Sequence, residues 1–426
     1  MRKIAVFGAG YIGLVTAACL AELGHTVAVR DIQDERIRLL NAGQVPIHEP
    51  GLAELIAGNA GRLTFTLSAE EALAGAEVVY VCVDTPPTAA GDADLSRVWS
   101  VIGTLKGAGR LKAVVVKSTV PVGTGARVRT VLDDSGLAHV GYAANPEFTA
   151  EGRAVADFMR PDRVVVGSSD EAAIRLVTEL HAGVDAPVEV MDVASAEMVK
   201  LASNAMLMTR ISFMNEIAVL CELTGADVER VAKAVGLDHR IGPHFLGAGI
   251  GWGGSCFPKD SEALKQLASN TGHHPQLLNA AIEVNNLQKR RAIQKLKDVL
   301  GGLDGARIAV LGMTFKPGTD DMREAPSTVL AARLLAEGAK VTCWDPLAPE
   351  SLPEPWASAV RHATPEQAMA EADAAILATA WPELLQVPWE AVRDTMARPV
   401  LYDGRNLLDP AGMRALGYTY VGVGRP

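Results

Sequence analysis

Short apolar runs alternate with longer helical patterns along the first 150 residues. The apolar run KIAVF precedes a helical stretch, LVTAACLAELG, and a second apolar run, TVAVRD. Three more apolar runs lie within AEVVYVCVDTPP, KAVVVKSTVPVG and HVGYAANPEF, and the first two end in loops rich in threonine and proline. Strands that alternate with helices are typical of a parallel sheet built from βαβ units. The pattern therefore predicts a doubly wound α/β domain.

A similar pattern returns near the C-terminus. The segment ARIAVLG…AARLLAEGAKVTCWD resembles RKIAVFG…AACLAELGHTVAVRD, and EQAMAEADAAILATAWPE resembles EEALAGAEVVYVCVDTPP. Between the two copies, residues 195 to about 290 have a helical pattern, including one long helix that we expect to end at Gly225. The predicted fold is α/β, with two Rossmann-like doubly wound domains joined by a central helical region with a long helix. The predicted boundaries are 1–194, 195–300 and 301–426.

Composition narrows the classes of function. With 426 residues, 49% of them apolar and 21% charged, the chain is typical of a globular protein of two or three domains. Its net charge of −10 argues against a general nucleic-acid or membrane-surface role. The five cysteines are scattered and form no C-x-x-C pair, which favours reduced thiols in the cytoplasm over disulfides or a metal site. No apolar run has membrane-spanning length, and we expect neither a signal peptide nor a bound metal.

The first turn carries a dinucleotide-binding fingerprint. In GAGYIG, Gly8, Gly10 and Gly13 lie between a predicted strand and a predicted helix, and the second strand ends at Asp31. In such a unit the glycines allow a tight turn, approach of the pyrophosphate and close helix packing, while the acid binds the ribose hydroxyls. The arrangement predicts NAD rather than NADP, although Arg30 could meet a 2′-phosphate.

The stretch GWGGSCFPKD, residues 251–260, places a cysteine just before a predicted helix. Pro258 suits the first turn of a helix, and a helix N-terminus favours the thiolate form of Cys256. Gly253 and Gly254 would let a ligand approach the backbone. On these residues alone, a reactive thiol and a small buried cysteine beside a glycine-rich turn are equally good interpretations.

Other polar residues lie where the predicted elements bring them together. Thr85, Thr119 and Glu147 follow predicted strands, and ligands bind beyond the carboxyl ends of strands in an open parallel sheet. Lys200 and Asn204 are four residues apart, on one face of the long helix. Turn residues, caps and a solvated helix face are the structural alternatives for these positions.

The C-terminal copy has lost its glycine fingerprint. Gly312 is followed by MTFKPGTDDMR, which contains Lys316 and Arg323. These two cations indicate that this domain holds another phosphorylated ligand, and a purely structural duplication is the alternative.

Eight long segments, in order along the chain, carry a family resemblance. They are GAGYIGLVTAACLAELGH, KSTVPVGT, NPEFTAEG, DFMRPDRVVVG, VKLASNA, GAGIGWGGSCFPKD, LGMTFKPGTDDMREAPS and YDGRN. The chain resembles the nucleotide-sugar 6-dehydrogenases, the UDP-glucose/GDP-mannose dehydrogenase family, nearly end to end, and FMRPDRVVVG is similar to the UDP-glucose branch. The resemblance implies a four-electron oxidation of UDP-glucose at C6 to the carboxylate, with two NAD used in turn, by a homodimer.

The resemblance also implies roles for individual residues. Cys256 matches the nucleophile, which forms a thiohemiacetal that is oxidised to a thioester; Lys200 and Asn204 would stabilise the oxyanion, and Asp260 would help to place water. The implied catalytic residues are Cys256, Lys200, Asn204, Asp260, Thr119 and Glu147. The implied cofactor-binding residues are Gly8, Gly10, Tyr11, Ile12, Gly13, Asp31, Arg36, Thr85, Thr119, Glu151, Lys259 and Arg323. The implied substrate-binding residues are Glu147, Phe148, Glu151, Lys200, Asn204, Arg240, Phe245, Leu246, Gly249, Gly253, Phe315, Lys316 and Arg405, with Arg240 reaching the neighbouring subunit's site.

Some positions depart from the family pattern, and other functions stay open. Arg30 and Gln33 put the cofactor preference in doubt, and Asp84 replaces a small residue beside the nicotinamide loop. Thr149 and Ala150 could loosen the selectivity for the sugar. The alternatives are a 6-dehydrogenase of GDP-mannose or a UDP-N-acetylhexosamine, a two-electron hydroxyacid dehydrogenase, and a non-enzymatic NAD-dependent sensor. The yield of NADH per sugar, two, one or none, separates the three classes of activity.

Overall fold

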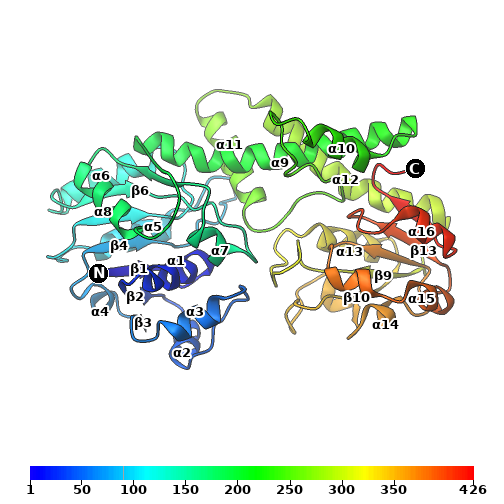
Figure 1. Cartoon of the computed structure of the whole chain (residues 1–426), viewed down its shortest axis with the longest axis horizontal. Helices are drawn as coiled ribbons and strands as arrows, with labels where there is room; N and C mark the ends of the chain where they lie inside the picture. Colours follow the sequence, from blue (N-terminus) through cyan, green and yellow to red (C-terminus); the bar gives the residue numbers. More distant parts are fainter. Residues whose placement is uncertain (90) are drawn as a thin grey trace. The chain divides into compact units, whose positions relative to one another are not determined.

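The computed structural model describes residues 1–89 and 91–426, which form two compact units (Figure 1). Unit 1 comprises Met1–Ser203 and Glu262–His273, and unit 2 comprises Asn204–Ser261 and His274–Pro426. Each unit contains one sheet with helices packed against it. Two helices, α9 (Val193–Thr224) and α11 (Phe257–Asn270), contribute residues to both units.

Unit 1 holds a sheet of eight strands, counted over the described residues, in the order β3-β2-β1-β4-β5-β6-β7-β8. All neighbours are parallel except β6 and β7. The strands are β1 (Lys3–Phe7), β2 (Thr26–Arg30), β3 (Leu63–Thr66), β4 (Val78–Val81), β5 (Ala113–Val116), β6 (Gly141–Ala144), β7 (Val164–Gly167) and β8 (Val188–Met191). The helices are α1 (Tyr11–Glu22), α2 (Asp34–Asn41), α3 (Leu52–Gly58), α4 (Ala69–Leu73), α5 (Ser96–Thr104), α6 (Thr124–Asp134), α7 (Ala154–Met159) and α8 (Glu171–Leu180). Because the strand order reverses between β1 and β4, the loops after these two strands flank the position where open α/β sheets bind ligands.

The central strands of unit 1, β1 and β4 to β7, are buried on both faces, as parallel sheets require. Alternate residues of β1 point to opposite faces: Ile4 and Val6 pack in one cluster, with side chains of α1, α3, α7 and α8. Ala5 and Phe7 pack in the other, with side chains of α4, α5 and α6. The continuous apolar runs of the sequence are therefore explained by two helical layers.

Unit 2 holds a sheet of six parallel strands, counted over the described residues, in the order β11-β10-β9-β12-β13-β14. The strands are β9 (Arg307–Leu311), β10 (Lys340–Trp344), β11 (Val360–Arg361), β12 (Ala374–Leu377), β13 (Val400–Asp403) and β14 (Thr419–Gly422). The helices after residue 300 are α13 (Pro326–Ala336), α14 (Pro365–Met369), α15 (Trp389–Thr395) and α16 (Pro410–Ala415), with short 3₁₀ segments at Trp356–Ser358 and Pro382–Gln386. This strand order is that of a complete Rossmann fold, so the prediction of two doubly wound domains and a long helix is confirmed.

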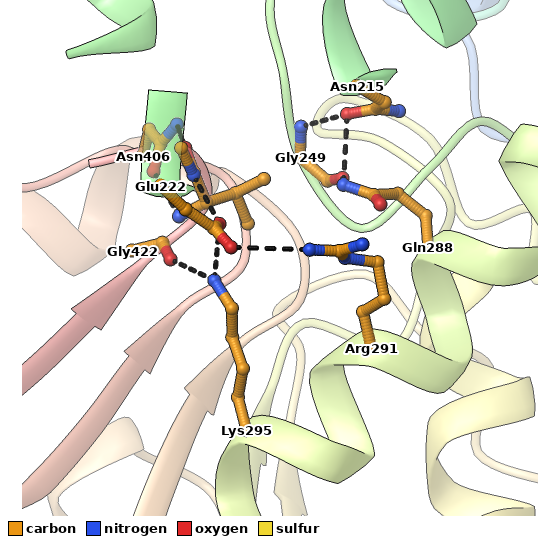
Figure 2. A network of polar contacts seen from close by, with 10 residues as sticks. Asn215, Glu222, Gly249, Gln288, Arg291, Lys295, Asn406 and Gly422 are labelled. Atoms are coloured by element: carbon orange, nitrogen blue, oxygen red, sulfur yellow. Dashed lines mark hydrogen bonds and ion pairs between the residues drawn. The ribbon is translucent and has the colours of Figure 1, made fainter. Parts of the chain in front are cut away.

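The central region is helical, with one long interruption. Its helices are α9, α10 (Val228–Gly236), α11 and α12 (Gln276–Leu300), and residues 237–256 between α10 and α11 contain no helix. Helix α9 ends one residue before Gly225, which has a left-handed φ of 76°. Figure 2 shows how unit 2 is held together at this place: Glu222 of α9 binds Arg291 and Lys295 of α12, and Lys295 also donates to the Gly422 carbonyl oxygen of β14.

Candidate active site

The glycine turn after β1 is built as the fingerprint predicts. Gly8 has a φ of 105°, and an added Cβ would lie 2.5 Å from the Cys82 carbonyl oxygen. A Cβ on Gly13 would lie 1.8 Å from the Gly8 carbonyl oxygen, so helix α1 can approach only with glycine there. Helix α1 begins directly after Gly10, and its N-terminal N–H groups favour an anion.

Asp31 lies at the end of β2 and is buried. Its carboxylate accepts hydrogen bonds from the Ala9 N–H (2.6 Å) and the Gln33 N–H (2.9 Å), and Arg36 lies 3.4 Å from the same carboxylate. The Arg30 side chain is engaged elsewhere: its Nε donates to the Leu67 carbonyl oxygen at 3.2 Å. This placement weakens the argument that Arg30 would meet a 2′-phosphate.

The ends of β4, β5 and β6 bring further predicted residues together within unit 1. Thr85 Oγ1 donates to the Thr119 carbonyl oxygen at 2.8 Å. Lys200 Nζ donates to Glu147 at 2.8 Å, and both side chains are at least 95% buried. Burial by itself raises the pKa of Glu147, but the Lys200 charge and hydrogen bonds from Lys200 and Thr149 outweigh it, so the pKa lies below its ordinary value. Glu147 is therefore held as a carboxylate in its ion pair with Lys200.

Sequence reasoning missed Glu49, which fastens the loop after Glu147 to the glycine turn. The buried Glu49 carboxylate accepts from the Tyr11 hydroxyl, from Gly152 N–H (2.7 Å) and from Ala154 N–H (2.7 Å). The Tyr11 hydroxyl, predicted to bind cofactor, is thus committed to Glu49 and Gly152. Since these partners lie far apart along the chain, no local pattern could have indicated the contact.

Phe148, Glu151 and Ile12 complete the predicted set in unit 1. Arg163 stacks on the Phe148 ring with its guanidinium carbon 3.7 Å from the ring centroid. Glu151 is half-buried in the loop that Glu49 fastens, and Ile12 is half-buried in the first turn of α1.

In unit 2, Cys256 directly precedes helix α11 and is half-buried. Its Sγ lies 3.6 Å from Ser255 Oγ. The other four cysteines are buried, and burial raises the pKa of each of these thiols, to about 12 for Cys19 and Cys82. Of the five thiols, Cys256 has the placement of a reactive one.

The tertiary structure gives a second reason why positions 253 and 254, just before Cys256, are occupied by glycine. A Cβ on Gly253 would lie 2.1 Å from the Glu324 carbonyl oxygen. Gly254 has a φ of 86°, and a Cβ there would lie 2.7 Å from the Phe315 ring. The bare backbone is therefore required by the chain's own loop after β9, whereas the sequence suggested a ligand as the neighbour.

The start of α11 carries another buried carboxylate, that of Asp260. Asn204 Nδ2 donates to Asp260 at 2.6 Å, and Lys259 forms an ion pair with the other Asp260 oxygen. Lys259, predicted to bind cofactor, is thus paired with Asp260 in the structure. Lys200 and Asn204 both lie on α9, one turn apart, as predicted.

The loop 245–251 contains three of the predicted substrate-binding residues, Phe245, Leu246 and Gly249. Phe245 is 43% exposed and has a left-handed φ of 60°, whereas Leu246 is buried. Figure 2 shows how Asn215 and Gln288 hold Gly249: Asn215 accepts from its N–H at 2.8 Å, and Gln288 donates to its carbonyl oxygen at 3.0 Å. The backbone of this loop is therefore fixed by α9 and α12.

Three predicted cations of unit 2 have different surroundings. Arg405 donates to the carbonyl oxygens of Ala378 (2.7 Å) and Gly251 (3.0 Å), and burial lowers its pKa to about 10. Arg323 binds Asp321 through two nitrogens and is largely exposed. Lys316 lies 5.4 Å from the centroid of the Phe315 ring. Arg405 thus connects two loops by hydrogen bonds, and it is also a candidate substrate-binding residue.

Arg240 lies on the surface of unit 2. Its side chain is 78% exposed and pairs with Asp238 at 2.6 Å. Among the residues that the structure describes, no group of three or more His, Cys, Asp or Glu side chains is placed to hold a metal ion. The helices within residues 1–89 and 91–426 include none with the length and apolar character needed to cross a membrane.

Taken together, the glycine turn, the acid at the end of β2 and the second Rossmann fold define a dinucleotide-dependent dehydrogenase architecture. Residues 2–185, 194–287 and 309–410 match the NAD binding, central and UDP binding domains of the UDP-glucose/GDP-mannose dehydrogenase family. The chain belongs to that family, and its first domain is the family's NAD binding domain. The predictions of fold, family and cofactor are confirmed.

Individual relatives align along the whole chain. The UDP-glucose 6-dehydrogenase of Pseudomonas aeruginosa is 45% identical, over 100% of this chain and 98% of its own length. The UDP-glucose 6-dehydrogenase TuaD of Bacillus subtilis is 43% identical, over 100% and 94%. Among solved structures, a UDP-glucose dehydrogenase from Pyrobaculum islandicum superposes with a TM-score of 0.93 at 38% identity, covering 100% of this chain and 98% of that one.

Proposed function

We propose that this protein oxidises the C6 hydroxymethyl group of UDP-glucose to the carboxylate of UDP-glucuronate, using two NAD per sugar. The observation that carries the proposal is the half-buried Cys256 at the start of α11, with four other cysteines buried away. The relatives named UDP-glucose 6-dehydrogenase, 43% and 45% identical over the full chain, support the choice of sugar.

The first turn fits NAD. The backbone at Gly10 is open, the N-terminus of α1 offers N–H groups to a diphosphate, and Asp31 lies where the ribose hydroxyls bind. Of the two Asp31 oxygens, Oδ1 accepts the Gln33 N–H, and a carboxylate oxygen has room for a second donor. When bound, NAD accepts a hydride in each of the two oxidation steps.

Lys200 and Asn204 stabilise the oxygen at C6 in this mechanism. The Lys200 side chain is oriented by its ion pair with Glu147, and a charge that is already oriented stabilises a developing oxyanion without reorganisation. The Asn204 amide has two N–H donors and gives one of them to Asp260, so the Asp260 contact orients the other.

The cysteine makes the second oxidation possible. The first oxidation converts the C6 alcohol to an aldehyde. The Cys256 thiolate adds to this aldehyde and forms a thiohemiacetal, whose carbon still carries a hydrogen that can leave as hydride. Loss of that hydride leaves a thioester, and water then releases the carboxylate and regenerates the thiol. In balance, one alcohol, two NAD⁺ and one water give one carboxylate, two NADH and three protons. Asp260 is the carboxylate that helps to place the water, with Thr119 and Glu147 as proton-transfer partners.

The experiment is to incubate wild type and Cys256→Ala with UDP-glucose and NAD, and to quantify the acid by mass spectrometry and the NADH by absorbance. Wild type should give two NADH per sugar. Cys256→Ala should fold and bind both ligands, since one sulfur is removed from a loop, but should make less than about a hundredth of the acid because no thioester forms. Acid formation within a few-fold of wild type would mean that the sulfur only packs.

Another nucleotide sugar is the second candidate. A UDP-D-ManNAc dehydrogenase from Pyrococcus horikoshii superposes with a TM-score of 0.88 at 30% identity, covering 100% of this chain and 99% of that one. The same chemistry would serve GDP-mannose or a UDP-N-acetylhexosamine. Assaying these sugars in parallel by NADH production ranks them, whereas a hydroxyacid dehydrogenase would give one NADH and a sensor none.

A homodimer is supported by a stripe of apolar side chains on α9. Met206, Phe213 and Leu220 are spaced seven residues apart, which places them on one helix face, and each is at least 52% exposed. Exposed apolar stripes mark protein–protein contacts. We infer that two copies pair through this face and that Arg240 enters the partner's sugar site. Phe213→Glu should shift the mass measured by light scattering from dimer to monomer.

The remaining assignments rest on the same reasoning. We assign residues 1–194 to the cofactor, 195–300 to the helical region that carries the cysteine loop, and 301–426 to the UDP-sugar. Cys19, Cys82, Cys221 and Cys343 are buried thiols, which supports a cytoplasmic location, where thiols stay reduced. Fractionation of cells that express the protein would test the location.

A further inference from the structure

The space beside Gly10 differs from that beside the other two glycines of the turn. Added Cβ atoms on Gly8 and Gly13 would collide with the chain's own backbone. At Gly10, apart from Gly10 itself and the two adjacent residues, the single heavy atom of the described residues within 4 Å of such a Cβ is a carboxylate oxygen, Asp84 Oδ1, at 3.9 Å. Gly10 is the position where the backbone of this turn approaches a pyrophosphate. A negative charge therefore borders the place where a negatively charged diphosphate binds.

Asp84 reaches this position from the loop after β4, across the point where the strand order reverses. Its carboxylate is paired with Arg97, whose guanidinium nitrogen lies 3.0 Å away. Arg97 is the second residue of α5. The two side chains are 70% and 49% exposed, and ion pairs with that exposure contribute little to folding stability. The effect of the pair on a nearby anion is a separate matter, because it depends on the net charge that the anion meets.

We propose that Asp84 and Arg97 form an ion pair that sets the affinity of unit 1 for its dinucleotide. Arg97 cancels the charge of Asp84 beside Gly10, so the diphosphate approaches a neutral pair. Without Arg97, the same approach is repelled by an uncompensated carboxylate. Arg97 is thus a positioning residue, acting through Asp84, and its importance depends on Asp84 being present.

A direct contact between Arg97 and a phosphate would also make Arg97 important, and the double variant separates the two cases. If Arg97 acts by cancelling Asp84, removing both charges restores binding. If Arg97 itself held the phosphate, removing both would leave binding as weak as removing Arg97 alone. Such a comparison is a double-mutant cycle, which isolates the pairwise term.

The experiment measures the dissociation constant of NADH by fluorescence titration, without any sugar. The variants are Arg97→Ala, Asp84→Asn and the double variant, with Arg175→Ala as the matched control. Arg175 also pairs with a carboxylate, Glu171, at 3.1 Å on a helix surface. Arg175 lies on α8, which begins directly after Asp170, and Asp170 lies beside Gly141 at the amino end of β6. The glycine turn lies at the carboxyl ends of the parallel strands, so Arg175 is on the opposite side of the sheet's strand ends.

Arg97→Ala should weaken NADH binding roughly three- to ten-fold at 20 mM salt, as expected for one carboxylate near a doubly charged diphosphate in water. The deficit should shrink to less than about two-fold at 0.5 M salt, because exposed charges are screened. Asp84→Asn and the double variant should bind within about two-fold of wild type or tighter, and Arg175→Ala should match wild type.

Equal binding by wild type and Arg97→Ala at low salt would overturn the proposal. A double variant as weak as Arg97→Ala, or a deficit that does not change with salt, would overturn it too. The inference rests on NAD binding at the glycine turn and not on the sugar. A wrong substrate would therefore change the activity assays and leave these titrations as they are.

Discussion

Replacing Lys200 by methionine tests how the buried ion pair with Glu147 is balanced. Both side chains are at least 95% buried, and removing one partner of such a pair leaves an uncompensated charge, which costs about 3–5 kcal/mol of folding free energy. Thr149 still donates its N–H (2.6 Å) and its hydroxyl (2.7 Å) to the Glu147 carboxylate. We therefore expect Lys200→Met to lose about 3 kcal/mol at pH 7.5, at the lower end of that range.

The pH dependence of this loss has a definite sign. In wild type the pKa of Glu147 is lowered, so the stability from this group is present above the unfolded pKa and is lost as pH falls through the folded pKa. In Lys200→Met the burial that remains raises the pKa, so folding favours the protonated acid. That contribution is present below the unfolded pKa of about 4.3 and is lost as pH rises through the folded pKa. The stability difference between wild type and variant should therefore shrink as pH falls from 7.5 to 5.5.

Urea unfolding of the ligand-free protein, followed by circular dichroism at both pH values, measures this difference. Lys112→Met is the matched control, because Lys112 also pairs with a glutamate, Glu77, but is 55% exposed. The control should lose less than about 1 kcal/mol. The reasoning is refuted if Lys200→Met loses no more than the control, or if its deficit is the same at both pH values. Lys200→Met/Glu147→Gln should regain part of the loss, since no buried charge remains unpaired.

Three further predictions follow from the site. Asp31 should make kcat/KM at least about ten-fold higher with NAD than with NADP, and equal values would contradict its assignment. Arg240→Ala should raise the dissociation constant of UDP-glucose several-fold while leaving that of NADH unchanged, as separate titrations by calorimetry would show; unchanged sugar affinity speaks against a shared site. Gly253→Ala should lower the melting temperature by several degrees, because its Cβ would overlap the Glu324 carbonyl oxygen, whereas Gly247→Ala, which meets nothing within 4 Å, should not.

Predictions made from local patterns agree best with the structure. The glycine turn, the start of α11 and the end of α9 depend on neighbouring residues, and each lies within one or two residues of the predicted place. Partners that are distant in sequence were not predictable in the same way. Glu49 binds Tyr11 from 38 residues away, and neither residue carries a local signal of that contact.

The sequence by itself determined the two Rossmann folds, the dinucleotide turn, the long helix and the cysteine at a helix start, because spacing and residue type fix these features within one element or one turn. Only the tertiary structure decided which charges are paired. It brings Lys200 to Glu147 across 53 residues, and it places the Glu324 backbone against Gly253. It also places Asp84 beside Gly10, where a carboxylate bears on an incoming diphosphate. Such contacts depend on how strands and loops are ordered in space, and the separation of two residues along the sequence does not indicate that order.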